Sequence, residues 1–245
     1  MERSGKSKVI LVPWDPNSSE HRQRLYEQRV ACGWKEDMIG KWQGLQREGK
    51  MTIQWVVLTD DDPARDSKLA QHIMQFPAEK ESILDSATSF GGMPRLLPDS
   101  PYSFIPVGHI SLDSEHPDPS LANPSEGLYC ISTFYISRAL QSCGLGRAAM
   151  DTVERIAIEE PLCAKTLALD TQAREQALNV EMWKAFKLSP PKVSNQDWYE
   201  RRGYKVYKRM ENNYAVADPA GKVWHISAVC MKKSVADSIG DSSTA

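Results

Sequence analysis

The chain has 245 residues, of which 41% are hydrophobic and 25% charged, and its formal net charge at pH 7 is −2. This length suits one or at most two domains with a sizeable core, and the near-neutral charge gives no reason to expect a nucleic-acid partner or a membrane surface. The five cysteines lack C-x-x-C spacing, and the five histidines lack paired ligand spacing. We therefore expect reduced thiols, a soluble protein in the cytoplasm or the nucleus, and no metal site.

The first quarter of the chain predicts two strands and two helices. It opens on polar and basic residues with no apolar core behind them, so we expect no signal peptide, and no later segment has the length needed to cross a bilayer. Asn17 with Glu20 three residues later marks a helix start, and Gly33 marks its end. We expect the second strand to alternate, with one face covered. The predicted elements are a strand over residues 8–12, helices over 18–32 and 34–48, and a strand over 52–58.

The segment after the second strand differs in composition. It begins with three aspartates and a proline at residues 60–63, and it carries Gly91, Gly92 and several prolines besides a short helical patch around Leu69. We interpret residues 64–103 as an insertion packed over one end of the sheet, where it would form a lid or a substrate wall. The alternative is a variable surface excursion without function.

The stretch from residue 128 to residue 158 has the strongest pattern. An apolar strand over 128–136 is followed by a glycine loop at 141–147 and then by a helix with apolar residues at i, i+3 and i+4 spacing. Gly144 and Gly146 let the backbone approach a ligand closely, while the helix N-terminus points unpaired N–H groups and the positive end of its dipole at the same place. This stretch therefore predicts an anion site suited to a phosphate.

The remaining elements are predicted from shorter patterns. Residues 113–126 are rich in Pro, Asp, Ser and Asn and predict an exposed loop. A Pro-Pro pair at position 190 must end a helix, and an Asp-Pro pair at position 218 predicts the turn of a hairpin. The polar residues 233–245 predict a disordered tail. The predicted elements are strands over 104–112, 165–170, 204–210 and 223–232, and helices over 172–187 and 195–202.

The glycine loop resembles that of a known family. The pattern Gln141-x-x-Gly144-x-Gly146, five residues after a strand, resembles the pyrophosphate loop of the GNAT superfamily of N-acetyltransferases, which receives acetyl-coenzyme A (acetyl-CoA). It is not a Walker loop, because no Lys-Ser or Lys-Thr follows, and it lacks the three-glycine dinucleotide fingerprint.

A second signature, Tyr199-x-x-x-Gly203-Tyr204, resembles the family segment in which a short helix ends in a glycine before the next strand. The two motifs stand in the family's order, with one strand between them. The resemblance implies an α/β (α+β) GNAT fold, with a central mixed, mostly antiparallel twisted sheet of about seven strands flanked by helices. It implies a single domain over residues 8–232, interrupted by insertions at about 64–103 and 172–194.

The resemblance also implies which residues bind acetyl-CoA. The backbone at the end of the strand 128–136 would face the pantetheine arm of the coenzyme. The N–H groups of the loop 141–147 would receive the diphosphate, and Arg147 would add a charge-assisted contact. Cys143 is interpreted as a loop residue rather than an acyl-carrying nucleophile, and helix capping is the alternative role for Asn195. The implied binding residues are Phe134, Tyr135, Ile136, Gln141, Ser142, Cys143, Gly144, Leu145, Gly146, Arg147, Asn195 and Tyr199.

Acetyl transfer needs a deprotonated amine, donors for the oxygen of the tetrahedral intermediate, and help for the departing thiolate. A backbone N–H near Ile136 would supply the donor. The resemblance gives the third role to Tyr199, whose phenol would hydrogen-bond to the forming thiolate; the alternative is an aromatic that packs the short helix. The candidates for the base are Asp170 and His109, followed by Glu126, each with an ordinary structural role as its alternative.

The functional hypothesis is direct transfer of the acetyl group from acetyl-CoA to a primary amine of a small molecule, through a ternary complex and without a metal. Trp34 and Trp183 would line an apolar acceptor site. Two alternatives stay open: acetylation of a protein lysine or amino terminus, and a non-catalytic module that binds coenzyme A. The sequence also leaves open whether the protein is a monomer or a homodimer.

Overall fold

The computed structural model describes residues 7–236, so residues 237–245 of the predicted tail lie outside the described part of the chain. The chain divides into two compact units. The first unit contains the residues up to Pro117 together with residues 131–163, and the second contains residues 118–130 and those from Ala164 onward. Within the described residues, no helix is long and apolar enough to cross a membrane.

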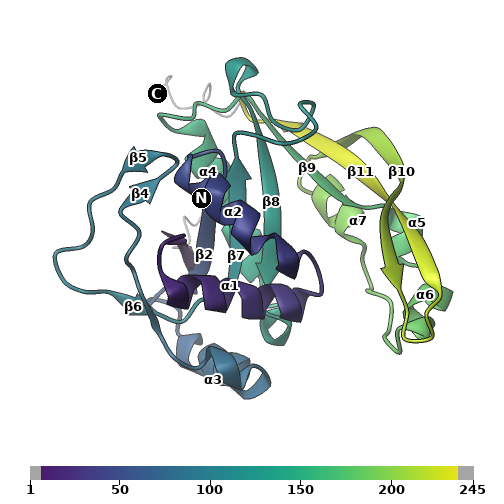
Figure 1. Ribbon diagram of the computed structural model, residues 1–245, viewed down its shortest axis with the longest axis horizontal. Helices are drawn as coiled ribbons and strands as arrows, with labels where there is room; N and C mark the ends of the chain where they lie inside the picture. The colour runs from purple at the N-terminus through teal and green to yellow at the C-terminus, as the bar shows by residue number, and fades with distance from the viewer. Residues whose placement is uncertain (1–6, 237–245) are drawn as a thin grey trace, which may run out of the picture. The chain divides into compact units, whose positions relative to one another are not determined.

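Seven strands form one mixed sheet with the order β1-β2-β7-β8-β9-β11-β10 (Figure 1). β8 and β9 run parallel, whereas the pairs β1-β2, β2-β7, β9-β11 and β10-β11 are antiparallel. This confirms the predicted mixed, mostly antiparallel sheet of about seven strands flanked by helices. Residues 128–130 of β8 belong to the second unit and pair with β9, while residues 131–136 belong to the first unit.

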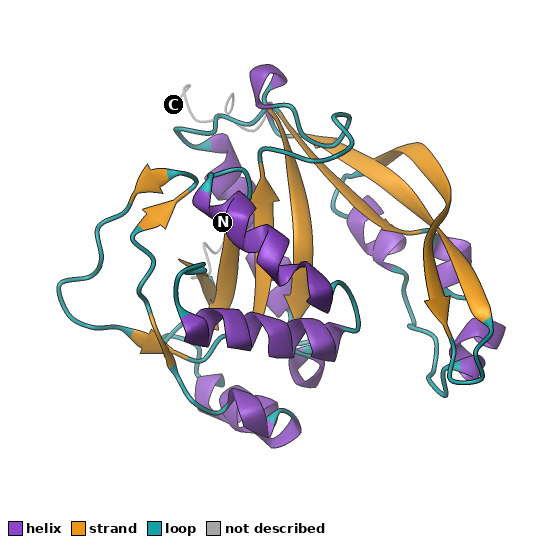
Figure 2. Ribbon diagram, in the orientation of Figure 1, coloured by secondary structure: helices purple, strands orange, loops and turns teal. Residues whose placement is uncertain are grey.

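In the first unit, α1 and α2 lie in front of the strands in the view of Figure 2. Their buried side chains, including Leu25 and Trp42, form one core cluster with Trp14 and Trp55. α4 contacts β1 and β7. The elements are β1 (Val9–Pro13), α1 (Ser19–Cys32), η1 (Glu36–Met38), α2 (Ile39–Arg47), β2 (Ile53–Leu58), α3 (Arg65–Gln75), η2 (Pro77–Glu79), β3 (Ile83–Leu84), β4 (Ser89–Phe90), β5 (Met93–Pro94), β6 (Ser103–Phe104), β7 (Gly108–Asp113), β8 (Leu128–Ile136), η4 (Arg138–Leu140) and α4 (Leu145–Ile158).

The first predicted helix is confirmed, with a correction at its start. The N-cap is Ser18, whose Oγ accepts the backbone N–H of His21 at 3.3 Å, rather than Asn17. The side-chain oxygen of Asn17 instead accepts a hydrogen bond from Arg47 at 2.9 Å. Gly33 ends the helix with φ +80°, a left-handed conformation that lets its N–H reach the carbonyls of the last turn.

Two other predictions for this region need correction. The second helix begins later than predicted, because a 3-10 turn, η1, precedes α2. All six residues of β2 are buried, so the strand is covered on both faces rather than on one. Trp55 and Val57 lie in the core cluster with α1 and α2, while Val56 and Leu58 on the other face are also buried. Strict alternation was therefore the wrong expectation for a strand enclosed by helices.

The insertion contains more structure than its composition predicted. α3 has 11 residues, and two small two-stranded sheets, β3-β6 and β4-β5, follow it. α3 contacts η4, the turn that leads from β8 toward the glycine loop. The next main strand, β7, begins at Gly108 rather than at residue 104, because residues 103–104 pair with β3 instead.

The second unit consists of the start of β8, the strand β9, a long hairpin of β10 and β11, and short helices beside them (Figure 1). Its core cluster joins Leu121 and Leu128 to Ala168 and Cys230. α7 contacts β9 and α5. The elements are η3 (Pro124–Glu126), β9 (Thr166–Gln172), α5 (Arg174–Ala177), α6 (Val180–Ala185), α7 (Asn195–Glu200), β10 (Lys205–Ala217) and β11 (Val223–Ser234).

The single helix predicted over residues 172–187 is wrong. β9 continues to Gln172, which pairs with Ala228 of β11, and two short helices, α5 and α6, occupy the remainder. Asn179 starts α6 by accepting the backbone N–H of Met182 with its side chain at 3.1 Å. An Asn that caps a new helix competes with continuation of the previous one, and helix propensity alone does not reveal this.

The hairpin of the second unit is longer than predicted. β10 extends to Ala217 and β11 to Ser234, so the first two residues assigned to a disordered tail belong to a strand. The predicted turn is confirmed at Asp218, whose Oδ1 accepts the backbone N–H groups of Ala220 and Lys222. This carboxylate closes the turn locally, so the strands pair right up to it, at Ala217 and Val223, although the register shifts between Met210 and Tyr214.

Candidate active site

The predicted anion site lies in the first unit, between the end of β8 and the start of α4. η4 follows β8 closely, and Gln141 returns to the strand by donating from Nε2 to the carbonyl of Ile136 at 3.5 Å. Ser142 and Gly144 have positive φ angles of 67° and 82°. These two left-handed residues turn the backbone sharply before the helix, which a glycine at position 144 permits without strain.

The N-terminus of α4 presents backbone donors instead of a capping side chain. Gly144 is the N-cap and carries no side chain that could satisfy the first amides. The backbone N–H of Ala148 bonds to the carbonyl of Gly144 at 3.1 Å. The N–H groups of Leu145, Gly146 and Arg147 precede it, so helix geometry gives them no acceptor within the helix. Together with the helix dipole, they are suited to bind an anion.

Two exposed cations add positive charge around this helix end. The Nζ of Lys8, just before β1, lies 4.0 Å from the position that a Cβ on Gly144 would take. Arg147 is exposed on the first turn of α4. Arg147 was predicted from the loop motif, whereas Lys8 was not. Lys8 lies far from the loop in sequence, and only the contact between α4 and β1 brings it near the start of α4.

The end of β8 is distorted and tightly packed. Thr133 has φ +47°, a conformation that β-branched residues rarely adopt. Tyr135 and Ile136, both predicted to face the coenzyme through their backbones, are buried, while Phe134 is half-buried. A Cβ on Gly108 would lie only 2.2 Å from the carbonyl oxygen of Tyr135, so β7 and the end of β8 approach backbone to backbone.

His109, one of the predicted bases, lies on β7 in the interior of the first unit. Its Nδ1 is 2.8 Å from Oε1 of Gln28, and its Nε2 is 3.3 Å from a guanidinium nitrogen of Arg29. Burial, followed by the positive charge of Arg29, holds the pKa of His109 well below its usual value. The neutral ring is engaged at both nitrogens and fully buried; its role as a base stays a prediction.

A chain of buried polar side chains connects His109 with the end of β8. Gln28 binds His109 and donates from Nε2 to Glu79 at 2.8 Å. Oε2 of Glu79 lies 3.4 Å from Nε2 of His72, and Nδ1 of the same ring lies 2.9 Å from Oγ of Ser137. Because Ser137 directly follows β8, this chain fixes the insertion to the segment that leads into the glycine loop.

Asp113, at the end of β7, is a titratable group that the sequence analysis missed. Its side chain accepts hydrogen bonds from the hydroxyls of Ser111 and Ser132, the second at 2.5 Å. Burial raises the pKa of Asp113 to about 6, although both hydroxyls and a backbone group of Thr52 act in the opposite direction. The sequence analysis began a loop at this residue. The alternation of His109, Ser111 and Asp113 on one strand face was the signal that could have found it.

The second unit holds the other predicted catalytic residues. Tyr199 is buried in α7, with its ring centroid 5.8 Å from that of Tyr204. Burial, followed by the negative charge of Asp170, raises the pKa of Tyr199, so its phenol stays protonated at neutral pH. Asp170, on β9, accepts a hydrogen bond from the hydroxyl of Tyr214. Glu126 is exposed in η3. The catalytic roles of these residues stay predictions.

Asn195 is the exposed first residue of α7 and not its cap. The cap is Ser194, whose Oγ accepts the backbone N–H of Asp197 at 3.0 Å. The capping interpretation of Asn195 is therefore wrong, and its contact with the coenzyme stays a prediction. Trp34 and Trp183, proposed to line the acceptor site, are both partly buried and lie in different units.

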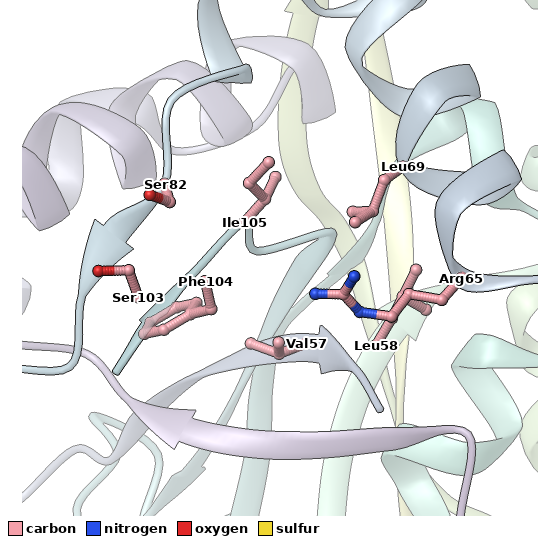
Figure 3. Close-up of a pocket in the computed structure, with 8 residues that line it drawn as sticks. All are labelled: Val57, Leu58, Arg65, Leu69, Ser82, Ser103, Phe104 and Ile105. Atoms are coloured by element: carbon pink, nitrogen blue, oxygen red, sulfur yellow. The ribbon is translucent and has the colours of Figure 1, made fainter. Parts of the chain in front are cut away.

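A cavity of about 250 Å³ lies in the first unit beside the insertion (Figure 3). The end of β2, the helix α3, and β6 with the residue that follows it supply mainly apolar walls, among them Leu58, Leu69 and Phe104. Figure 3 shows the guanidinium of Arg65 pointing toward the hollow. Arg65 also forms ion pairs with two exposed aspartates. The insertion thus forms part of the wall of a small cavity at the end of β2.

The middle of the chain matches a known protein family. Residues 77–187, which include β7, β8, the glycine loop and α4, match the model described as the acetyltransferase (GNAT) family. The protein is therefore an acyltransferase. More narrowly, the matched part of the chain is a GNAT acetyltransferase domain, as the glycine-loop motif predicted. No curated protein matches the chain significantly.

Several solved structures resemble the chain at low sequence identity. The aminoglycoside 6'-N-acetyltransferase from Enterococcus faecium has 12% identity and a TM-score of 0.48, with 92% of this chain and 96% of that chain covered. A GNAT family acetyltransferase from Elizabethkingia anophelis with acetyl-CoA bound has 9% identity and a TM-score of 0.47, covering 94% and 100%. NAA60 from Arabidopsis thaliana in complex with acetyl-CoA has 11% identity and a TM-score of 0.47, covering 93% and 98%. Likeness this distant gives no substrate for this chain.

Within residues 7–236, no group of three or more His, Cys, Asp and Glu side chains is placed to hold a metal ion.

Proposed function

We propose that this protein transfers the acetyl group of acetyl-CoA directly to a primary amine of a small molecule. The observation that carries the proposal is the start of α4. Gly144 caps this helix, Ser142 and Gly144 are in the left-handed conformation, and the first amides of the helix follow them. These groups fit the diphosphate of coenzyme A, because they offer several N–H donors and the positive end of a helix dipole at one place. Lys8 and Arg147 add positive charge there.

The chemistry that we propose needs no covalent enzyme intermediate. The amine nitrogen attacks the thioester carbonyl, the oxygen of the tetrahedral intermediate is held by a backbone N–H near Ile136, and the C–S bond then breaks. We assign the phenol of Tyr199 as the hydrogen-bond donor to the departing thiolate. Its raised pKa favours this role, since a phenol that stays protonated can donate a hydrogen bond throughout the reaction.

We propose a small, partly apolar amine as the acceptor, for which the partly buried Trp34 of the first unit would supply an apolar surface. Two other functions remain as alternatives: acetylation of a protein lysine or amino terminus, and binding of coenzyme A without turnover.

The test is a thiol-release assay with acetyl-CoA and a panel of polyamines, arylalkylamines and lysine-containing peptides. We expect release of coenzyme A and formation of an acetylated product with at least one small amine, and slower turnover of the peptides. Preferred turnover of peptides would contradict the small-molecule acceptor. Binding of acetyl-CoA without any thiol release would instead support the non-catalytic module.

Tyr199→Phe tests the assigned donor. Loss of the hydroxyl should lower kcat by about 100-fold, in the range expected of a group that assists proton or charge transfer, while coenzyme A still binds. Tyr207→Phe is the matched control, because this tyrosine also lies in the second unit and its hydroxyl, which bonds to Ser120, has no assigned role in the reaction. A Tyr199→Phe protein that folds and turns over at the unmodified rate would remove this residue from the mechanism.

A further inference from the structure

We propose that Asp113 accepts the proton of the acceptor amine, with the hydroxyl of Ser132 as the relay between them. The inference rests on the proposed function and supplies its base, a role for which the sequence offered only Asp170, His109 and Glu126. Asp113 lies in the same unit as the glycine loop, on the strand next to β8.

The register of the sheet places Asp113 on the face covered by α1 and α2. In the β2-β7 pair, His109 is opposite Trp55 and Ser111 is opposite Ile53, and both of these partners belong to the core cluster under the two helices. Because side chains alternate along a strand, Asp113 follows His109 and Ser111 on that face. Trp34, which we proposed as part of the acceptor site, lies in the segment between these two helices.

The relay hydroxyl comes from the distorted part of β8. Oγ of Ser132 lies 2.5 Å from Oδ2 of Asp113, and the next residue, Thr133, has φ +47°. Asp113 is only 5% exposed, whereas Ser132 is half-buried. Ser132 is therefore the more accessible end of the pair, and an amine on this side of β8 would meet the hydroxyl before the carboxylate.

The charges around Asp113 leave its carboxylate without a cation in contact. Among residues 7–236, its hydrogen-bond donors are hydroxyls and a backbone group, and the cation that acts on it from a distance is Lys35, in the turn between α1 and α2. Lys50 is engaged with Glu48 and Glu115, and His109 on the same strand is neutral. Burial without a cation raises the pKa of Asp113 to about 6. The group is thus ionised at neutral pH, yet it is a stronger base than an exposed carboxylate.

The proton balance of the step is complete. The ammonium group of the acceptor gives one proton to Oγ of Ser132, while the hydroxyl proton passes to Asp113. The free amine attacks the thioester, and the C–S bond of the tetrahedral intermediate breaks. The nitrogen then gives its second proton to the departing thiolate. Asp113 returns its proton to water through Ser132, which restores the starting state.

The pH dependence of kcat/KM tests this assignment, with acetyl-CoA and the amine of highest turnover in the panel. The unmodified protein should gain activity with a midpoint near pH 6, where Asp113 ionises. Asp113→Asn should lose about 100-fold or more in kcat/KM and lack this midpoint, because the amide cannot accept the proton. Glu115→Gln is the matched control, since it removes an exposed carboxylate two residues away. It should keep both rate and midpoint.

The two serines separate the relay from simple support of the carboxylate. Ser132→Ala should lower the plateau value of kcat/KM, reached well above the midpoint pH, by about tenfold. The reason is that it removes the hydroxyl between the amine and the carboxylate. Ser111→Ala removes a hydrogen bond to the same carboxylate from the fully buried side. It should move the midpoint to higher pH and retain most of the plateau rate.

The outcomes distinguish a failure of the role assigned to Asp113 from a failure of the proposed function. If Asp113→Asn keeps the rate, or loses rate but keeps the midpoint near pH 6, then Asp113 is not the proton acceptor and only this inference is overturned. If the unmodified protein neither binds acetyl-CoA nor acetylates any amine, the proposed function fails and this inference fails with it. Chemical denaturation at pH 8 should show that Asp113→Asn is folded, so a loss of rate cannot be assigned to unfolding.

Discussion

The glycine loop before α4 and the polar stripe of β7, formed by His109, Ser111 and Asp113, lie in the same unit but are built differently. The loop is made of backbone groups from neighbouring residues, and its function depends on conformation. The stripe is made of side chains whose partners outside β7 come from α1 and β8. A site of the first kind is visible in a short sequence motif, whereas a site of the second kind exists only after the chain has folded.

The two ends of the stripe show what burial does to groups of opposite charge. Burial is the largest influence on both His109 and Asp113, and in each case it favours the neutral form. It therefore lowers the pKa of the histidine and raises that of the aspartate. A buried row of this kind is neutral at mildly acidic pH, and raising the pH above about 6 places one negative charge in it.

The largest effect should come from Gly108→Ala, which tests the close approach of the β7 backbone, just before the stripe, to the end of β8. The new Cβ would lie 2.2 Å from the carbonyl oxygen of Tyr135, which has no room to withdraw. We expect a loss of about 3 kcal/mol or more in the free energy of unfolding, measured by chemical denaturation. Gly44→Ala is the control, because its Cβ meets nothing within 4 Å in the middle of α2. That change should stabilise by about 1 kcal/mol. Equal stability of the two variants would disprove the close approach.

Asp113→Asn should have the next largest effect, on the pH dependence of stability. The pKa of Asp113 rises from 3.8 to about 6 on folding, so the native state holds a proton that the unfolded state has released between these values. Its contribution to stability therefore falls as the pH rises from about 4 to 6, by about 3 kcal/mol in total. Asp113→Asn should remove this loss and be more stable than the unmodified protein at pH 8, but not at pH 4. A variant that is less stable at pH 8 would contradict the assigned environment.

His109 changes the free energy of unfolding with pH in the opposite direction to Asp113. Its pKa is lowered in the folded state, so below about pH 6.5 the unfolded chain binds a proton that the native ring does not. Stability falls as the pH drops through that range. In Asp113→Asn this dependence is no longer opposed by Asp113, and unfolding measured from pH 4 to pH 7 should show stability rising with pH.

A smaller effect is expected from Gly144→Ala, which tests the loop without touching the stripe. A left-handed conformation costs an alanine about 1–2 kcal/mol, and Gly144 has φ +82°. Gly33→Ala carries the same strain at the end of α1, where φ is +80°. Both variants should lose similar stability, but only Gly144→Ala should bind coenzyme A more weakly, by about tenfold in a calorimetric titration. Equal affinity in the two variants would separate the loop from the ligand.

The smallest effect is expected from Lys8→Gln. The Nζ of Lys8 lies near the loop but is exposed, so its attraction for a diphosphate is screened by salt. We expect affinity for coenzyme A to fall about threefold at low ionic strength, and the difference to shrink at 0.5 M salt. A loss that does not depend on salt would point to a structural role of this lysine.

The sequence predicted the order of the main strands and the loop, because both follow from local patterns. The apolar strand 128–136 and the glycines at 144 and 146 specify their structure within a few residues of chain. The helix predicted over 172–187 failed because Asn179 caps a new helix and Gln172 pairs with a distant strand. Asp113 was missed for a related reason. Its environment depends on Ser132, which lies 19 positions later and reaches it only through the pairing of β7 with β8.

The most direct test of the central claim is an amide NMR titration of the unmodified protein with coenzyme A. If the first turn of α4 holds the diphosphate, the largest shifts should fall on the backbone N–H signals of residues 142–147. The shifts should saturate with one ligand per chain and be weaker in Gly144→Ala. Saturable binding that leaves these amides unmoved, or the absence of any binding, would contradict the account of this site.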